Sequence, residues 1–440
     1  MREPLGHRRE HVGPPVRADR WFAGARIPSR TDSCKSPFPA FQLISRTLGY
    51  ANIPVSMPSP LTQTPASWTR NELCEALAPD GLALCELLAV AAGLRDQSHG
   101  RVVSFSRNVF LPLTTLCRDY CTYCTFRADP GDSGARIMSP DEVLGEVQRA
   151  QGRGCTEALF SLGDKPEAEF IEMRQTLAAL GYRTTLGYLD AVCRRVLAES
   201  SLIPHSNPGL MPRAAMQHLA ESNGSLGLML ENSSDRLMTS GMPHHRAPDK
   251  DPRRRIETIE NAGRHRIPFT TGILFGIGET IPECVDSLLT IRALHERYGH
   301  IQEVIVQNFR AKADTSMATH VEPNFDQVLR TAAVARVALG AEMNIQVPPN
   351  LSGSDYPRLL DAGINDWGGI SPLTPDYINP EAPWPHLQEL KRQTQLKGFE
   401  LRERLAVYPR YIEWAAAHSP LLDQRLRELA DAKGYRRGGL

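Results

Sequence analysis

After Arg101 the sequence alternates short runs of β-branched and apolar residues with longer amphipathic segments, and this alternation restricts the fold more than any other feature. Such a pattern is typical of successive β–α units, in which helices cover parallel strands. Eight strands with helices between them predict an α/β protein with a TIM-type barrel. Periodicity alone leaves a doubly wound open sheet as an alternative, so the pattern does not decide whether the barrel closes.

The expected elements can be read directly from the pattern. The expected strands cover residues 102–113, 157–161, 202–206, 226–231, 269–275, 302–308, 344–348 and 365–370. The expected helices cover residues 139–153, 167–180, 190–199, 212–221, 251–265, 280–298, 324–340 and 355–362. The first of these helices has a marked start, because Ser139 can cap it and Pro140 suits the first helical position.

The barrel is expected to cover residues 101–384, with segments of a different character on either side. Residues 1–68 are Arg-rich and then Pro-rich, which predicts a flexible, disordered extension. A transit peptide is a weaker alternative, because acidic residues interrupt this stretch. Residues 69–100 carry apolar residues at helical spacing and are expected to form an N-terminal helical segment. Residues 385–440 are expected to form a C-terminal helical cap on the barrel.

Composition narrows the function classes only slightly. The 440 residues are 41% hydrophobic and 23% charged, which describes an ordinary globular chain. Lys and Arg together number 50, as do Asp and Glu, so the charge indicates neither nucleic acid nor a membrane as a partner. Nine cysteines, an odd number, with no secretory apolar region favour a reducing cytoplasm over a disulfide framework.

Cys117, Cys121 and Cys124 form a C-x3-C-x2-C motif directly after an apolar, strand-like run. Three thiolates in one loop can hold three corners of a cubic 4Fe–4S cluster. The nearest other cysteines lie about 30 residues away, so one iron would keep an open coordination position, as catalytic metal sites do. A structural zinc site would need a fourth ligand, and merely buried cysteines would have no reason to share one polar loop. Both of these alternatives are therefore weaker.

The cysteine motif, with Tyr123 as its aromatic residue, resembles the signature of the radical S-adenosylmethionine (SAM) superfamily. In that superfamily the amino and carboxylate groups of SAM chelate the open iron, and the aromatic residue lies against the adenine. The resemblance implies a 4Fe–4S cluster and SAM as cofactors, with Cys117, Cys121 and Cys124 as the cluster ligands. It also favours the barrel over the open sheet.

Further candidate SAM-binding residues follow the expected strands, where the active residues of such barrels lie. The resemblance assigns the turn after the second strand to the SAM amino group. It assigns the end of the fourth strand to the ribose or methionine part, and the end of the fifth to the adenine. Each of these three segments has an alternative interpretation. The first can be an ordinary turn, the second can end in a solvated carboxylate, and the third can be a turn that caps the next helix. The candidates are Gly163, Asp164, Pro166, Glu231, Ser233, Gly276 and Gly278.

A longer stretch, residues 108–127, resembles one branch of the superfamily, the 7,8-didemethyl-8-hydroxy-5-deazariboflavin (FO) synthases of coenzyme F420 biosynthesis. Residues 304–312 and 366–375 are also typical of this branch. The resemblance implies a lyase that cyclises 5-amino-5-(4-hydroxybenzyl)-6-(D-ribitylimino)-5,6-dihydrouracil to FO with loss of ammonia. The reaction would start when a 5'-deoxyadenosyl radical abstracts a hydrogen atom from this adduct.

The candidate substrate-binding residues are polar side chains that follow other expected strands. A uracil edge and a ribityl chain need both hydrogen-bond donors and acceptors. A single histidine is more often a surface or hydrogen-bonded residue than a functional one, and only the shared position at the barrel rim favours these histidines. No catalytic side chain is assigned. The candidates are His205, Asn207, His244, Asn308, Arg310 and Asn350.

The sequence has no second C-x3-C-x2-C motif, so it does not match the fused two-domain form that also makes the adduct. A separate adduct-forming partner enzyme is implied, together with an electron donor such as ferredoxin or flavodoxin. Another radical SAM carbon-skeleton enzyme, such as the subunit that couples tyrosine to the diaminouracil, is the nearest alternative. An iron–sulfur redox or sensor protein and a zinc-binding structural protein are alternatives from other classes.

Overall fold

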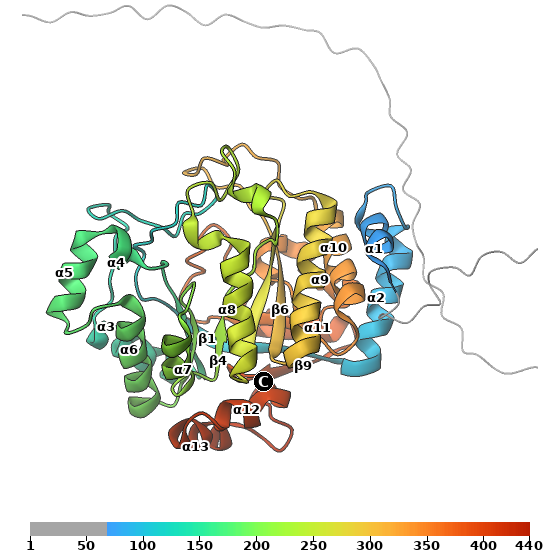
Figure 1. The fold of residues 1–440 in the computed structure, drawn as a ribbon. Coiled ribbons are helices and arrows are strands. Elements are labelled where there is room, and N and C mark those ends of the chain that lie inside the picture. Colours follow the sequence, from blue (N-terminus) through green and yellow to red (C-terminus); the bar gives the residue numbers. More distant parts are fainter. Residues whose placement is uncertain (1–67) are drawn as a thin grey trace, which may run out of the picture. The chain divides into compact units, whose positions relative to one another are not determined.

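Strand β1 (Val102–Pro112) joins the two ends of the strand order and so closes the sheet. It pairs in parallel with β8 (Asp366–Ile370) along one edge and with β2 (Glu157–Ser161) along the other. The strands between follow in chain order, from β2 to β8. The structure, a computed structural model, describes residues 68–440 (Figure 1), so the predicted extension lies outside the described residues except for its last position. The closed parallel barrel confirms the predicted fold class.

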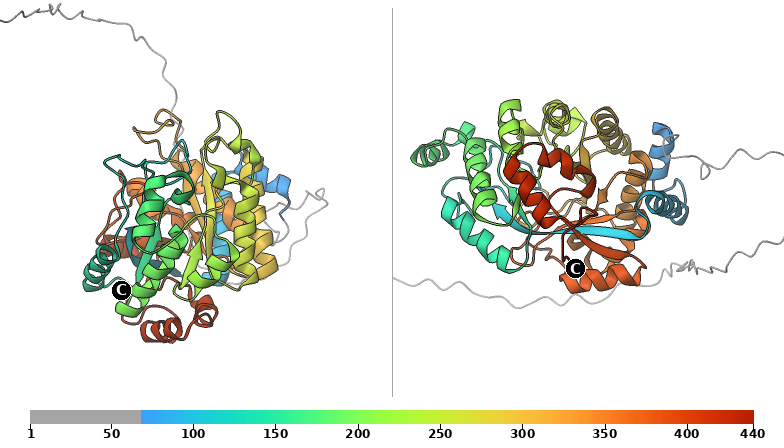
Figure 2. Two further views of the ribbon diagram at one scale, coloured as in Figure 1. Left: turned by 60° about the vertical axis from the view of Figure 1, so that its left-hand side comes forward. Right: turned by 90° about the horizontal axis from the view of Figure 1, so that it is seen from below.

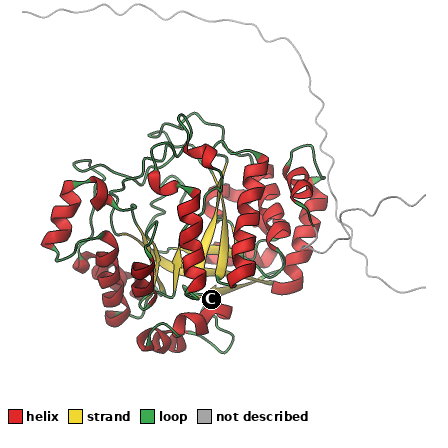
Figure 3. Ribbon diagram, viewed as in Figure 1, coloured by secondary structure: helices red, strands yellow, loops and turns green. Residues whose placement is uncertain are grey.

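All eight predicted strands are present, and helices surround them (Figure 3). They are mostly buried, because in a parallel barrel one face packs on helices and the other faces the interior. β5, for example, is buried at every position. The remaining barrel strands are β3 (Ile203–Asn207), β4 (Ser225–Gly227), β5 (Phe269–Phe275), β6 (Ile301–Asn308) and β7 (Ile345–Gln346).

Helices lie between the strands where they were predicted, but the one over 167–180 is divided at Phe170, the one over 190–199 begins earlier, at Thr185, and the last one is not an α-helix. The predicted start at Ser139 is confirmed, because its side chain accepts from the backbone N–H of Glu142 in a full capping box. The segment predicted as an α-helix over 355–362 is the 3-10 helix η5 (Pro349–Ala362), which contains Pro357 and non-helical Gly353. The others are α3 (Pro140–Gly152), α4 (Pro166–Glu169), α5 (Ile171–Ala179), α6 (Thr185–Glu199), α7 (Arg213–Ala220), α8 (Pro252–Arg264), α9 (Ile281–Tyr298) and α10 (Phe325–Leu339). Two short 3-10 helices, η3 (Asp235–Met238) and η4 (Pro248–Lys250), lie between β4 and α8.

Two N-terminal helices pack outside the barrel, α1 (Arg70–Leu77) and α2 (Leu84–His99). Both contact α10, and Figure 1 shows them beside it. The Arg330 guanidinium of α10 fixes them by donating to the backbone carbonyls of Ala76 and Leu82. None of the helices in residues 68–440 has the length and apolar character needed to cross a membrane.

The sequence predicted a helical C-terminal segment. The structure corrects this, because the segment also contains the strand β9 (Glu400–Arg404). β9 pairs in parallel with residues 102–106 of β1, which extend beyond the part of β1 that pairs with β2. The helices after β9 lie across the underside of the barrel (Figure 2). The other elements of this segment are α11 (Leu387–Leu396), η6 (Pro409–Tyr411), α12 (Ile412–Ala416) and α13 (Pro420–Leu429).

β9 also contributes a buried arginine to the lower end of the barrel interior. Arg404 donates from Nε to Asp366 Oδ2 over 2.8 Å and from a terminal nitrogen to Glu303 Oε1 over 3.1 Å. The Tyr408 hydroxyl donates to the same Glu303 oxygen over 2.9 Å. Every charge in this group therefore has a partner, as buried ionic groups require.

Candidate active site

A cavity of about 360 Å³ lies inside the barrel, beneath the cysteine-containing loop. Its volume falls within the range of small-molecule sites. Each of the nine strands contributes at least one residue to its wall, and so do Cys117, Cys121 and Cys124. The loop that would hold a metal cluster therefore opens onto the same space as the barrel interior.

The three cysteines lie in a loop that is held by polar contacts. The backbone N–H groups of Asp119 and Asp164 donate to Sγ of Cys117 over 3.4 and 3.2 Å. Burial raises the pKa of Cys117 to about 12, and it raises that of Cys121 further. Thiols in such surroundings ionise when a bound cation stabilises the thiolate, as the iron of a cluster does. The donor set therefore fits a 4Fe–4S cluster, and N–H groups aimed at a sulfur are among the features that tune its potential.

Tyr123, between the second and third cysteines, lines the cavity. Its hydroxyl lies 2.9 Å from Nε2 of His244 and is hydrogen-bonded to it. Burial raises the pKa of Tyr123 well above its usual range and lowers that of His244 well below it, so both side chains are neutral near pH 7. His244, a predicted substrate residue, is not part of the cavity wall and contacts Tyr123 instead.

The turn after β2 contacts the cysteine loop directly at Gly163. A Cβ atom at this position would lie closer than 3.0 Å to atoms of Leu116 and Cys117, so only glycine allows this contact. Asp164 follows it and lines the cavity. Its Oδ1 is buried without a hydrogen-bond partner among residues 68–440, and Lys165 Nζ remains 3.6 Å away. A buried acceptor of this kind suits an ammonium group, such as the amino group of SAM.

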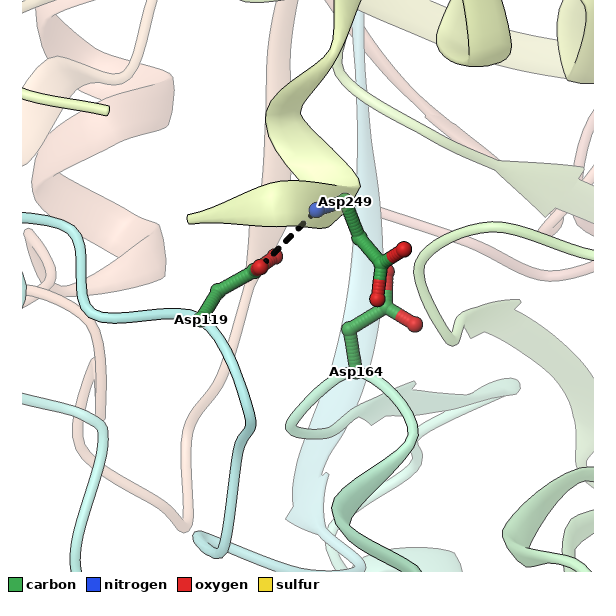
Figure 4. A group of neighbouring side chains, drawn as sticks. All are labelled: Asp119, Asp164 and Asp249. Atoms are coloured by element: carbon green, nitrogen blue, oxygen red, sulfur yellow. Dashed lines mark hydrogen bonds between the residues drawn. The ribbon is translucent and has the colours of Figure 1, made fainter. Parts of the chain in front are cut away.

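Three aspartates from separate segments meet beside this turn (Figure 4). One oxygen of each of Asp119, Asp164 and Asp249 lies within 4.8 Å of the others, and the N–H of Asp249 donates to Asp119 over 3.0 Å. Burial raises the pKa of Asp164 to about 7. Three cations lie within 4 Å of this group and offset part of its negative charge: Arg118, Lys165 and Arg254, which all pair with Asp249. The group thereby connects three segments of the chain.

Glu231, predicted to contact SAM, lines the cavity and has a left-handed backbone with φ of 64°. Its Oε1 lies 2.5 Å from Nζ of Lys250, which also lines the cavity. Burial alone would lower the pKa of Lys250, but the Glu231 carboxylate raises it overall. The site therefore presents a fixed ion pair rather than a free carboxylate.

The other predicted SAM residues do not belong to the cavity wall within residues 68–440. Pro166 begins helix α4, and the hydroxyl of Ser233 lies 3.2 Å from that of Ser287. Gly276 and Gly278 both have positive φ and form the turn between β5 and α9. Their roles toward SAM remain predictions.

The predicted substrate residues fall into two groups. His205 and Asn207 of β3 line the cavity. Asn308, Arg310 and Asn350 lie outside its wall in the described part of the chain. Asn308 is buried at the end of β6, and Arg310 donates to the Leu351 carbonyl over 3.3 Å. Asn350 donates to Asp376, which does line the cavity, over 3.0 Å. Contact of these residues with a substrate remains a prediction.

The sequence interpretation missed the polar side chains that point into the barrel from within the strands. Only polar residues at the ends of strands were predicted to bind ligands, whereas these side chains lie deeper inside the barrel. A period-2 run of small polar residues in β1, Ser104-x-Ser106-x-Asn108, was the available signal. The missed wall residues are Asn108, Glu157, Thr270, Gln302, Glu303, Gln346 and Arg404.

A sequence profile of the radical SAM superfamily matches residues 111–291. Among solved structures, methylornithine synthase shares the fold with a TM-score of 0.61 at 19% identity, covering 77% of this chain and 95% of that one. The hydrogenase maturase HydG of Carboxydothermus hydrogenoformans gives 0.62 at 18% identity, covering 82% and 86%. With the closed barrel and the three-cysteine loop, these findings define a radical SAM protein.

Curated relatives narrow the class further. The chain is 47% identical over 336 residues to the 7,8-didemethyl-8-hydroxy-5-deazariboflavin synthase of Methanopyrus kandleri, covering 76% of this chain and 100% of the relative. It is 46% identical to the FO synthase of Nocardia farcinica over 86% of this chain, and 47% identical to that of Mycobacterium tuberculosis over 81%. The chain spans only 46% of the length of the Nocardia farcinica protein and 43% of the length of the Mycobacterium tuberculosis protein. The chain belongs to the 7,8-didemethyl-8-hydroxy-5-deazariboflavin synthase family.

Proposed function

We propose that this chain cyclises 5-amino-5-(4-hydroxybenzyl)-6-(D-ribitylimino)-5,6-dihydrouracil to FO, with loss of ammonia, in coenzyme F420 biosynthesis. One observation carries the proposal: the three cysteines and the polar barrel interior line the same cavity. A radical made beside the cysteine loop would therefore form next to side chains able to bind a polar heterocycle. The names of the relatives support FO as the product, and the adduct as substrate is part of the proposal.

Residues of this chain would hold the two cofactors that membership of the superfamily implies. Cys117, Cys121 and Cys124 would bind the 4Fe–4S cluster, while Asp164 would accept from the SAM amino group and Tyr123 would face the adenine. When bound, the reduced cluster and SAM supply a 5'-deoxyadenosyl radical that can abstract hydrogen from an unactivated carbon. The chain itself positions the reactants and excludes water.

The cavity wall suits both of these tasks. Apolar side chains from β1, β2 and β5 exclude water around the reacting carbon: Phe110, Leu159 and Leu274. His205 and Asn207 would hold the polar part of the substrate. Gly227 of β4 leaves room for Asn207, since a Cβ atom there would lie closer than 3.0 Å to the Asn207 side chain. The Nδ1 of His205 is hydrogen-bonded to the Ser225 hydroxyl over 2.5 Å, which fixes the orientation of the ring.

A separate enzyme would form the adduct, and a ferredoxin or flavodoxin would deliver the electron. Both follow from the proposed reaction, because the adduct is its substrate and the cluster must be reduced. The cytoplasm is the proposed compartment, since a cluster with an open iron needs reducing surroundings. The eight cysteines described by the structure are all free thiols, which agrees with this proposal.

The test is anaerobic reconstitution of the purified chain with iron and sulfide, followed by incubation with SAM, dithionite and the adduct. Formation of fluorescent FO, identified by its mass, together with 5'-deoxyadenosine supports the proposal. If no FO forms, either from the adduct or from tyrosine plus diaminouracil, the proposal is wrong. Adduct formed from tyrosine plus diaminouracil would favour the coupling reaction. An intact cluster that releases no 5'-deoxyadenosine would favour an iron–sulfur redox protein.

A further inference from the structure

Two adjacent glycines in β8, Gly368 and Gly369, make room for two amide side chains. A Cβ atom on Gly369 would lie 2.1 Å from Nδ2 of Asn108, and a Cβ atom on Gly368 would lie 2.2 Å from Nε2 of Gln346. Both distances are too short for any residue other than glycine while the amides keep these positions. Asn108 comes from β1 and Gln346 from β7, the two strands that pair with β8. The glycine pair therefore allows one carboxamide to enter from each side of the strand.

The amide of Asn108 has unused hydrogen-bonding capacity. The residue is only 1% exposed, and neither Oδ1 nor Nδ2 has a hydrogen-bond partner among residues 68–440. Buried amides are normally paired, and an unpaired one destabilises the folded protein. Asn108 lines the cavity, so the missing partner would lie in the cavity itself.

Gln346 occupies the matching position on the other side of β8. It is 7% exposed and also lines the cavity. The charged residues deeper in the barrel are already paired with one another, as Arg404 is with Glu303 and as Glu157 is with Ser106. The amides of Asn108 and Gln346 are therefore not used by these charged residues and remain available to bind a ligand.

We propose that Asn108 and Gln346 form a subsite that recognises the pyrimidinedione edge of the substrate. A carboxamide presents one donor and one acceptor side by side, which complements the adjacent N3–H and C=O groups of a cyclic imide. The adduct and FO share this imide, so one subsite would bind both. The inference rests on the proposed function, and it assigns a role to the Gly-Gly pair of β8.

Binding of FO, followed by the change in its own fluorescence, tests this subsite without turnover. The probes are FO and its N3-methyl derivative, which lacks the imide donor. We expect the unaltered protein to bind FO at least about tenfold more tightly than N3-methyl-FO, the effect of one unmade buried hydrogen bond. Asn108→Leu and Gln346→Met should weaken FO binding by a similar factor and leave binding of N3-methyl-FO nearly unchanged.

Two further variants guard against misfolding and against general effects on the cavity. Asn108→Asp keeps the size of the side chain and the acceptor for N3–H but loses the donor to the neighbouring C=O, so it should weaken FO binding and still retain a preference for FO over N3-methyl-FO. Gln307→Met removes another amide of the cavity wall that does not contact the β8 glycines, and it should preserve the preference. Circular dichroism of each variant should match that of the unaltered protein.

The outcomes separate this inference from the proposed function. If the Asn108 and Gln346 variants weaken both ligands equally, the amides contact another part of the molecule, such as the ribityl chain, and the inference is wrong. If they weaken neither, a bound water satisfies Asn108, and the inference is also wrong. In both cases the unaltered enzyme would still form FO from the adduct. Failure to form FO, despite release of 5'-deoxyadenosine, would overturn the proposed function and this inference with it.

Discussion

The Tyr123 hydroxyl and Nε2 of His244 lie 2.9 Å apart, and this hydrogen bond joins the cysteine loop to the long segment between β4 and α8. The two rings also meet edge to face, with centroids 5.7 Å apart. His244 is buried at 3% exposure and Tyr123 is partly buried, so the hydrogen bond is shielded from much of the solvent. The pair fixes the orientation of the ring that is proposed above to face the SAM adenine.

A double-mutant cycle should reveal this coupling. Tyr123→Phe and His244→Leu should each lower the free energy of unfolding by about 1–3 kcal/mol, because each leaves one buried polar atom unpaired. The double variant should lose less stability than the two single losses added together, by about 0.5–3 kcal/mol, since it leaves no buried polar atom of this pair without a partner. Urea unfolding of all four proteins measures this difference. Strictly additive effects would contradict the coupling, and Tyr120→Phe, at a more exposed tyrosine paired with Asp129, serves as control.

The cysteine loop gives the most direct prediction about cofactors. Cys117→Ala, Cys121→Ala and Cys124→Ala should each remove the brown absorbance of the reconstituted protein and abolish release of 5'-deoxyadenosine. Loss of one thiolate leaves two ligands, too few to hold a cluster with one open iron. Cys85→Ala, at an exposed cysteine outside the loop, should change neither property. SAM cleavage retained by any of the three loop variants would overturn the assignment.

The strands and the cysteine loop were predictable from the sequence, for physical reasons. Parallel strands that are buried on both faces have continuous runs of apolar residues, whereas the apolar residues of helices recur every three or four positions. The alternation of eight strands with helices could therefore be recognised in the sequence. The spacing of Cys117, Cys121 and Cys124 was equally clear, because few structures bring three thiolates into one short loop. Gly163 and Asp164 were found for the same reason, next to a marked strand end.

β9 and the interior polar residues could not be predicted in the same way. The sequence of β9, Glu-Leu-Arg-Glu-Arg, reads as a solvated helix, and only pairing of its charges inside the protein makes it a buried strand. Arg404 is buried because Glu303 and Asp366, far away in the sequence, surround its guanidinium. Local patterns carry no information about such long-range partners, so Arg404 and Gln346 were identified only from the structure.

The aspartate group beside the cysteine loop should contribute strongly to stability. Asp249 is 0% exposed and lies 2.8 Å from Arg254 and 3.5 Å from Lys165. Asp249→Asn should lower the free energy of unfolding by about 1–3 kcal/mol, the usual effect of losing hydrogen bonds to a charged group, because its cationic partners are only partly buried. Asp235→Asn, at an exposed aspartate 4.0 Å from Arg253, should cost about 1 kcal/mol at most. Equal effects of the two substitutions in urea unfolding would show that the group is not a structural link.

His300, at the lower end of β6 and away from the cavity wall, should make stability depend on pH. It is 0% exposed, and burial lowers its pKa to about 3. The unfolded chain binds a proton at this histidine below about pH 6.5 while the folded protein does not, so stability falls as pH decreases from 6.5 toward 3. Between pH 6.5 and 5 the unaltered protein should therefore lose about 2 kcal/mol more than His300→Leu. Urea unfolding at both pH values measures this difference, with His245→Leu at an exposed histidine as control. Equal pH dependence of the unaltered protein and His300→Leu would show that His300 is not buried in its neutral form.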